Sequence, residues 1–284
     1  MRIYVCALAL VCAVGCRAPA RSAVASAAVS LNRHTALVGG PVEITYTFVV
    51  ADQARFTEDY AVMLNVINAD HELVWTDNHQ PPTPTTSWTP GSRIQYTRTV
   101  FVPLRADPGD VTLQIGLYSP GSQTRLPLIG TDVGGRAYDA GRLRIERAST
   151  LADYTAGWHD REVAEHDPSV EWRWTTGQAA LSFKNPRRDA TLYLHLDNPG
   201  DVFEDTQHVD VTMGAQQLAE FDLVPKHPQI RKILLKAADM GTGDAFEVRI
   251  AVDKTFVPAT SAHGSSEDHR ELGVRVFHAL VEPD

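Results

Sequence analysis

The chain has 284 residues, of which 43% are hydrophobic and 8% aromatic, so it has enough apolar material for folded cores and is not a disordered sequence. A chain of this length most naturally makes two domains. Its 35 acidic and 26 basic residues give a formal charge of −9. This charge disfavours a nucleic-acid partner and non-specific attraction to anionic lipid.

The first 16 residues have the layout of an export signal. Arg2 precedes a short apolar run, Ile3 to Val14, which is too short to span a bilayer as a helix. The run ends in the small residues Ala13-Val14-Gly15, directly before Cys16. The mature chain is therefore predicted to be exported.

The segment that ends at Cys16 resembles the lipobox of bacterial lipoproteins, in which the cysteine is diacylated and becomes the new N-terminus. Ala13 departs from the leucine that is usual there. Cys6 and Cys12 lie in the part that is removed, so Cys16 would be the single thiol of an exported chain, a liability unless it is consumed. Two acyl chains anchor a protein stably, and we expect such a lipid anchor. The alternative is an ordinary signal, cut at the small residues before Cys16 or near Ala25-Ser26-Ala27.

The segment after the cysteine predicts a tether. Residues 17–28 are mostly small and show no apolar periodicity. A flexible coil of this length spans on the order of 20 Å. Arg17 stands where the aspartate that often retains lipoproteins at the inner membrane would be, which favours the outer membrane.

From residue 29 the apolar residues alternate with a period of two, which is typical of half-buried strands. The pattern is clearest over Val42–Phe48, where every second side chain is apolar. Turn-forming segments separate the expected strands, and helical patterns are nearly absent. These features predict an immunoglobulin-like β-sandwich over residues 29–148. Its expected strands are 42–48, 61–67, 72–76, 94–102 and 111–118.

Residues 148–157 interrupt the alternation, after which a second series of strands begins. Eight strands suit a jelly-roll-like sandwich, predicted over residues 157–284. The fold class is therefore all-β, with two antiparallel sandwiches. The expected strands are 171–174, 179–184, 190–197, 208–213, 218–223, 230–236, 246–253 and 273–281.

Two groups of segments resemble β-sandwich modules that recur in bacterial envelope proteins, including the tails of membrane glycosyltransferases. The resemblance implies non-catalytic β architecture in a glycan-handling setting, and it supplies no site residues. The first group comprises residues 77–79, 88–91, 116–120 and 125–128, and the second comprises 172–174, 253–258 and 270–274.

Two loops contain residue types that can bind metals. They lie at His159–Asp167 and His263–His269. Neither has the helical spacing of a zinc protease, so both are interpreted as solvated charged loops, and no metal or cofactor is predicted. No serine-nucleophile motif occurs, and no pair of carboxylates stands out as a glycosidase site. The sequence thus favours a protein without catalytic activity.

Trp172 and Trp174 are the candidate ligand-binding residues. Because they are two apart on an expected strand, they share one face, while Arg173 points to the other. Tryptophan can stack on the apolar face of a sugar ring, but aromatic side chains more often fill cores, and the core interpretation is favoured.

These observations predict a lipid-anchored protein of the cell envelope that binds or scaffolds an envelope glycan or glycoconjugate. Two alternatives remain open. One is a structural subunit that docks on a membrane protein complex, and the other is a hydrolase with unrecognised loop residues.

Overall fold

The computed structural model describes residues 22–147, 152–165, 167–200, 203, 205–260 and 266–284. The lipobox-like segment and Cys16 lie outside this range. The described residues contain many strands and no α-helix, only the two 3-10 turns Thr85–Ser87 and Pro258–Thr260. The all-β prediction is confirmed. No helix within these residues is long and apolar enough to cross a membrane.

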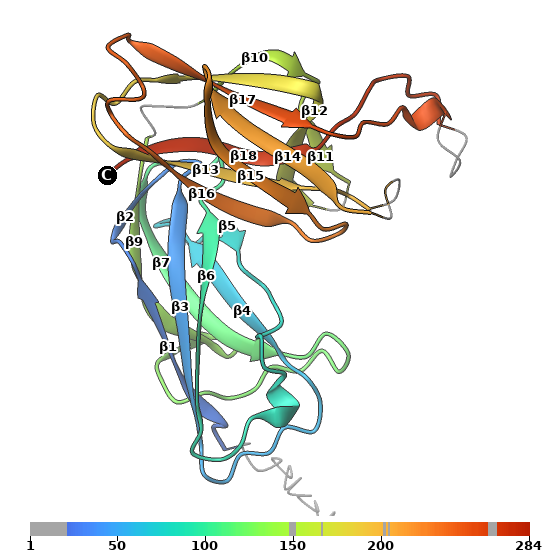
Figure 1. Cartoon of the computed structure of the whole chain (residues 1–284). Helices are drawn as coiled ribbons and strands as arrows, with labels where there is room; N and C mark the ends of the chain where they lie inside the picture. Colours follow the sequence, from blue (N-terminus) through green and yellow to red (C-terminus); the bar gives the residue numbers. More distant parts are fainter. Residues whose placement is uncertain (1–21, 148–151, 166, 201–202, 204, 261–265) are drawn as a thin grey trace, which may run out of the picture.

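The N-terminal sandwich (residues 22–147) has the two-sheet arrangement of an immunoglobulin-like domain (Figure 1). One sheet has the order β1-β3-β6, with β1 at Ala25–Leu31, β3 at Pro41–Val50 and β6 at Arg93–Phe101. The other has the order β2-β9-β7-β4-β5, and β8 pairs with β9. Its strands are β2 (Thr35–Leu37), β4 (Ala61–Ile67), β5 (Leu73–Thr76), β7 (Gly109–Tyr118), β8 (Asp132–Gly134) and β9 (Ala137–Glu146).

The predicted core face of β3 is confirmed. Val42, Ile44, Tyr46 and Phe48 are each at most 1% exposed. They belong to one hydrophobic cluster with the inward side chains of β4 and β7. Burying side chains of this size contributes roughly 1.5–3 kcal/mol each, so this alternation accounts for much of the stability of the sandwich.

The predicted tether is too long. Strand β1 begins at Ala25 and pairs with β3 from Ala25 opposite Val50 to Leu31 opposite Ile44. Ala25 is fully buried. The pattern did not predict this strand because alanine and serine have low β-propensity, whereas pairing with β3 overrides that preference.

The residues Asp77 and His79, part of the resemblance to envelope modules, hold the chain between β5 and β6. Asp77 is 7% exposed and accepts a hydrogen bond of 2.8 Å from the Tyr46 hydroxyl. The Arg98 guanidinium donates to both oxygens of the same carboxylate, at 2.9 Å to each. His79 Nε2 lies 2.8 Å from the Tyr96 hydroxyl. Burial lowers the pKa of His79 and raises that of Tyr46, so both side chains are neutral at pH 7.

The C-terminal sandwich (residues 152–284) has jelly-roll order, as predicted. One sheet runs β16-β13-β18-β12 and the other β15-β14-β17-β12, so β12 belongs to both. Strands β10 and β11 pair with β12 outside this path. The strands are β10 (Asp153–Trp158), β11 (Glu162–Ala164), β12 (Asp167–Lys184), β13 (Ala190–Asp197), β14 (Gln207–Met213), β15 (Gln216–Leu223), β16 (Gln229–Leu235), β17 (Ala245–Val252) and β18 (Arg275–Pro283).

Two predictions for this half are corrected. The expected strands 171–174 and 179–184 form the single 18-residue strand β12. The predicted break at 148–157 contains the start of β10, which pairs with β12 from Asp153 opposite Ser182. Gly157 permits this pairing, because it has φ +73° and an added Cβ would lie 1.8 Å from the Gln178 carbonyl oxygen. From Asp153 onward the break in alternation therefore marked an irregular strand.

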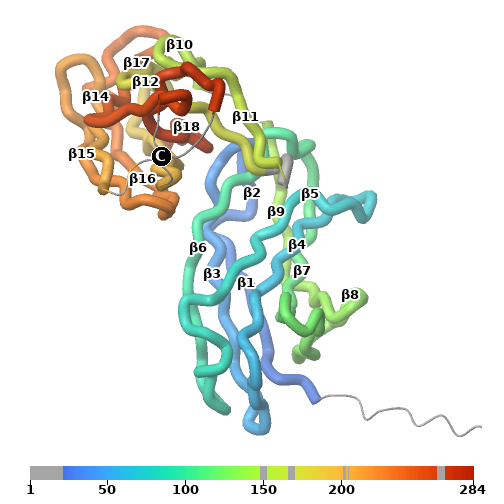
Figure 2. The backbone as a smooth tube through the Cα atoms, turned by 90° about the vertical axis from the view of Figure 1, so that its right-hand side faces the viewer, coloured from blue at the N-terminus to red at the C-terminus, as the bar shows by residue number. Residues whose placement is uncertain are grey.

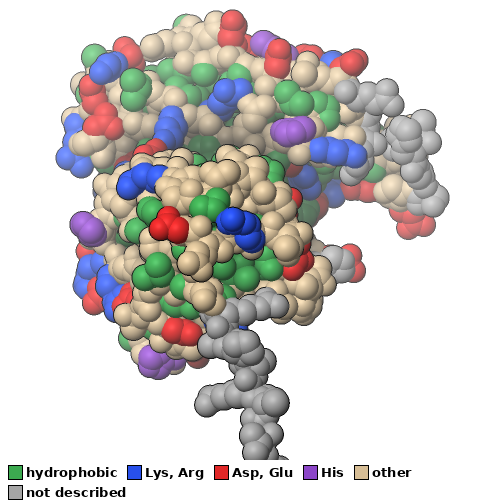
Figure 3. All heavy atoms as spheres, turned by 90° about the horizontal axis from the view of Figure 1, so that it is seen from below, with side chains coloured by type: hydrophobic (Ala, Val, Ile, Leu, Met, Phe, Trp, Pro, Cys, Tyr) green, Lys and Arg blue, Asp and Glu red, His purple; other side chains and the backbone are tan. Residues whose placement is uncertain are grey.

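The two sandwiches have separate hydrophobic clusters and are stacked end to end (Figure 2). Ion pairs cross between them from Arg33 to Glu282 and from Lys232 to Glu43. The start of β1 lies at the end of the N-terminal sandwich far from the C-terminal one (Figure 1). Seen from that end, acidic and basic side chains are scattered rather than gathered in one patch (Figure 3).

The close approach of β10 to β12 predicts a large difference between two glycine substitutions. Gly157→Ala should destabilise the chain by more than about 3 kcal/mol, since the backbone must move to make room. Gly214 has φ +59° but no atom within 4 Å of the added Cβ. Gly214→Ala should therefore cost only about 1 kcal/mol. Urea unfolding measures both, and equal losses would contradict the assigned contact.

Candidate functional site

A cleft opens beside the contact between the two sandwiches. Its volume is ≈ 300 Å³. A smaller hollow of ≈ 110 Å³ adjoins it and shares Leu104, Tyr154 and Phe277 with it. The cleft is lined by Leu104 from the N-terminal sandwich and by Tyr154, Arg161, Glu171, Trp172, Arg173, Val276 and Phe277 from the C-terminal one.

Three strands each bring one aromatic ring to this cleft. Tyr154 comes from β10, Trp172 from β12 and Phe277 from β18. The rings of Trp172 and Phe277 meet edge to face with centroids 6.2 Å apart. Phe277 lies at a bulge, because His195 and Leu196 of β13 pair with His278 and Val276, which leaves one extra residue on β18. A bulge changes the direction of the side chain at the extra residue, and here that residue is Phe277, whose ring lines the cleft.

The Tyr154 ring is held in place by two neighbours. The Arg173 guanidinium lies over it at 4.8 Å, and Trp158 meets it edge to face at 4.8 Å. Burial raises the pKa of Tyr154 above its usual value. The phenol therefore stays protonated near neutral pH and can both donate and accept a hydrogen bond.

Charged groups lie around the rings. Arg161 donates to Glu171 at 3.0 Å, and Arg173 donates to the His159 carbonyl at 3.1 Å. The cleft thus combines apolar ring surface with guanidinium donors and a carboxylate acceptor. Such a combination suits a ligand that has an apolar face and several hydroxyl groups.

The structure places the two predicted tryptophans differently. Arg275 lies over both rings, at 5.1 Å from Trp172 and 5.8 Å from Trp174, so they share a face. Trp174 is 7% exposed and meets Phe256 edge to face at 5.6 Å. Trp172 is half-buried, and its Nε1 has no hydrogen-bond partner among the described residues. Only Trp172 lines the cleft, whereas Trp174 has a core environment.

The two His/Asp/Glu loops come together around an arginine. Arg270 donates to Glu162 at 2.8 Å and to Asp268 at 2.6 Å, and the His159 Nε2 lies 2.7 Å from the Glu271 carbonyl. The Arg270 guanidinium lowers the pKa of Asp268 to about 2. These contacts make Glu162 and Asp268 parts of one ion-pair network with Arg270. His166 and His263 lie outside the described residues.

The sequence patterns missed a cluster on the β14–β15 hairpin. His208, Asp210 and Glu220 place possible metal-ligand atoms within 4.8 Å of one another. The cluster also has internal partners, since His208 Nδ1 lies 2.8 Å from Asp222 and Gln217 donates to both Asp210 and Glu220. The hydrogen bond to Asp222 raises the pKa of His208. Only the strand register brings these residues together, so spacing along the chain gave no signal.

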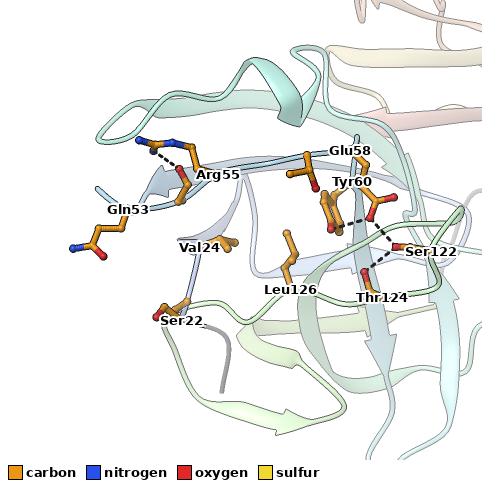
Figure 4. Close-up of a pocket in the computed structure, with 12 residues that line it drawn as sticks. Ser22, Val24, Gln53, Arg55, Glu58, Tyr60, Ser122, Thr124 and Leu126 are labelled. Carbon is orange, nitrogen blue, oxygen red and sulfur yellow. Dashed lines mark hydrogen bonds between the residues drawn. The ribbon is translucent and has the colours of Figure 1, made fainter. Parts of the chain in front are cut away.

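A second cavity, of ≈ 460 Å³, lies at the far end of the N-terminal sandwich, where Ser22 and Val24 line it (Figure 4). The Glu58 carboxylate accepts hydrogen bonds from Tyr60 at 3.0 Å and from Ser122 at 2.7 Å. Ser119 donates to it at 2.6 Å. These bonds join the loops that wall the cavity, so they have a structural role.

No protein-family model matches the chain, and no curated protein sequence matches it. Among solved structures it is similar to Bacteroides uniformis β-glucuronidase, with TM-score 0.30 and 9% identity over 93% of this chain and 30% of that chain. The M60 catalytic domain of Clostridium perfringens ZmpB with its CBM51-1 and CBM51-2 domains gives TM-score 0.23 and 10% identity over 85% and 34%.

The native conformation of E. coli alpha-2-macroglobulin gives TM-score 0.27 and 13% identity over 90% of this chain and 14% of that chain. This chain thus spans about a third or less of the length of these proteins. Likenesses this distant carry no argument about its function.

The different burial of the two tryptophans predicts different losses of stability. Trp174→Ala should leave a cavity and cost about 3–5 kcal/mol. Trp172→Ala should cost less, about 1–2 kcal/mol, because part of its surface already faces water. Chemical denaturation of both variants measures this. A loss at Trp172 as large as that at Trp174 would contradict the assignment of Trp172 to the cleft.

Proposed function

We propose that the protein is a lipid-anchored envelope protein that binds glycan in the cleft between its two sandwiches. The observation that carries this proposal is the convergence of Tyr154, Trp172 and Phe277 on one hollow rimmed by Arg161 and Glu171. Small-ligand sites are often found at domain interfaces, where aromatic walls and a few polar groups give orientation. At ≈ 300 Å³ the cleft suits a short glycan segment.

The chemistry of the lining favours binding over hydrolysis. Glycosidases require two carboxyl groups on either side of the scissile bond. Among the described residues that line the cleft, Glu171 is the only acid, and it is paired with Arg161. The sugar hydroxyls would exchange hydrogen bonds with these two groups, while an aromatic ring covers the apolar face of the sugar.

The proposal predicts that cleft substitutions abolish glycan binding without unfolding the chain. A glycan array should first identify a ligand for the intact protein. Tyr154→Ala and Trp172→Ala should then weaken its binding about fivefold or more, because each removes a stacking surface worth about 1 kcal/mol or more.

Phe221→Ala is the matched control. Phe221 is a half-buried ring on β15 with Arg231 over it at 4.3 Å, as Arg173 lies over Tyr154. This variant should bind as the unaltered chain does. Equal binding by the three variants would overturn the cleft assignment, and a protein that binds no glycan on the array would favour docking to a protein partner.

The position of β1 supports an anchor that presents the cleft away from the bilayer. Ser22 follows Cys16 by six residues and lines the cavity at the far end of the N-terminal sandwich. Strand β3 has 10 residues, or about 33 Å, and extends between that end, where Val50 pairs with Ala25, and the C-terminal sandwich. An anchor at Cys16 would thus hold the cleft roughly this distance further from the membrane.

Replacing the proposed lipid-bearing residue gives a direct test. Cys16→Ser should prevent diacylation and move the protein from the detergent phase to the aqueous phase in a Triton X-114 partition, because two acyl chains supply the membrane affinity. Cys12→Ser, within the predicted signal, should leave the partition unchanged. A Cys16→Ser protein that stays in the detergent phase would rule out the lipid anchor.

A further inference from the structure

Two histidines face each other where the sandwiches meet. His195 of β13 lies directly opposite His278 of β18, with their Nδ1 atoms 3.3 Å apart. The two rings are nearly parallel, at 7°, with centroids 5.6 Å apart. This arrangement fits a hydrogen bond in which one Nδ1–H donates to the lone pair of the other. It requires that at least one imidazole is neutral.

The N-terminal sandwich contacts this pair through Phe101, the last residue of β6. Its ring is parallel to both imidazoles, at 8° and 4.3 Å from His278 and at 2° and 5.7 Å from His195. The ring of Phe277, which lines the cleft, has its centroid 4.9 Å from that of His195. The same pair of histidines therefore supports both the contact between sandwiches and one wall of the cleft.

The charged groups around the pair are already engaged. Asp197 of β13 accepts two hydrogen bonds from Arg275 of β18, at 2.8 and 2.6 Å. The ion pairs of Arg33 with Glu282 and of Lys232 with Glu43 lie around Tyr193, two residues before His195. No described carboxylate forms a hydrogen bond with either imidazole. Desolvation is thus the main effect on the pKa values of both histidines, and it favours their neutral forms.

We propose that protonation of the His195–His278 pair separates the two sandwiches and opens the cleft. The cleft would then hold its ligand near neutral pH and release it in acid. The release of ligand rests on the proposed function, whereas the separation of the sandwiches does not.

The direction of the pH effect follows from linkage. Burial lowers the pKa of His195 to about 4, and burial together with the neighbouring His195 lowers the pKa of His278 to about 3. Separation of the sandwiches would return both imidazoles to water, so their pKa values would rise toward the ordinary value of about 6.5. The equilibrium between docked and separated sandwiches therefore favours docking most above about pH 6.5. It shifts toward separation as the pH falls below that value. Between pH 7 and 4.5 each histidine shifts the docking constant toward separation by up to about 50-fold.

Distances between nitroxide labels in the full-length chain test this without any ligand. The exposed residues Leu73 and Leu234, one in each sandwich, are suited to Leu73→Cys and Leu234→Cys labelling in a background in which Cys6, Cys12 and Cys16 are replaced by serine. Double electron–electron resonance should give one narrow distance distribution at pH 7.5. At pH 4.5 a broad distribution with longer distances should appear while the far-UV circular dichroism stays the same.

The double variant His195→Phe with His278→Phe should keep the narrow distribution at pH 4.5, because its rings still stack on Phe101 and cannot gain a proton. His208→Gln, a control histidine in the same sandwich, should broaden as the unaltered chain does. A narrow distribution in the unaltered chain at pH 4.5, or equal broadening in the double variant, would overturn the proposal.

NMR titration of the histidines in the unaltered chain tests the proposal even if the double variant does not fold. The C2–H resonances of two histidines should titrate below about pH 5, together with the broadening. Titration of all histidines near 6.5 would overturn the proposal. If the array shows no glycan binding but the sandwiches still separate in acid, only the proposed ligand is ruled out. The failure of the proposed function and the failure of the pH effect are therefore distinguishable.

Discussion

The C-terminal sandwich depends on one constraint, which is that β12 must serve two sheets. Its first half pairs with β18 through Arg173 and Trp174, and its second half pairs with β17 from Gln178 onward. Close backbone approaches surround the change of sheet. A Cβ on Gly273 would lie 2.5 Å from the Thr175 hydroxyl. A side chain at Gly273 would push the segment before β18 away from β12. The bend at which β12 changes sheet therefore requires a glycine at this position.

The cleft is a consequence of this bend. Strand β12 brings Trp172 to the cleft, while β10 supplies Tyr154 and the bulge in β18 supplies Phe277. The sandwich is therefore stabilised by side chains inside the bend, such as Trp174, while those at its margin remain available to a ligand. One strand thus carries Trp174 in the core and Trp172 at the cleft, two residues apart. The two tryptophans therefore do not share one role.

Alternation in the sequence predicted the strands that bury one face, with β4 and β13 found at their observed bounds. It failed for β1, where alanine carries little strand signal, and for β12, where the change of sheet looked like a gap between two strands. The shared face of Trp172 and Trp174 was predictable from their spacing. Their different burial was not, because it depends on Phe256 from a distant loop and on Leu104 from the other sandwich.

Because each sandwich has its own hydrophobic cluster, the contact between them can change without unfolding either one. A ligand that touches Leu104 on one side and Phe277 on the other would bind the docked arrangement more tightly than the separated one. Linkage then requires a reciprocal effect, in which protons that weaken docking also weaken ligand binding, and bound ligand opposes protonation of His195 and His278. The aromatic contact between the sandwiches and the proposed site are in this way two parts of one equilibrium.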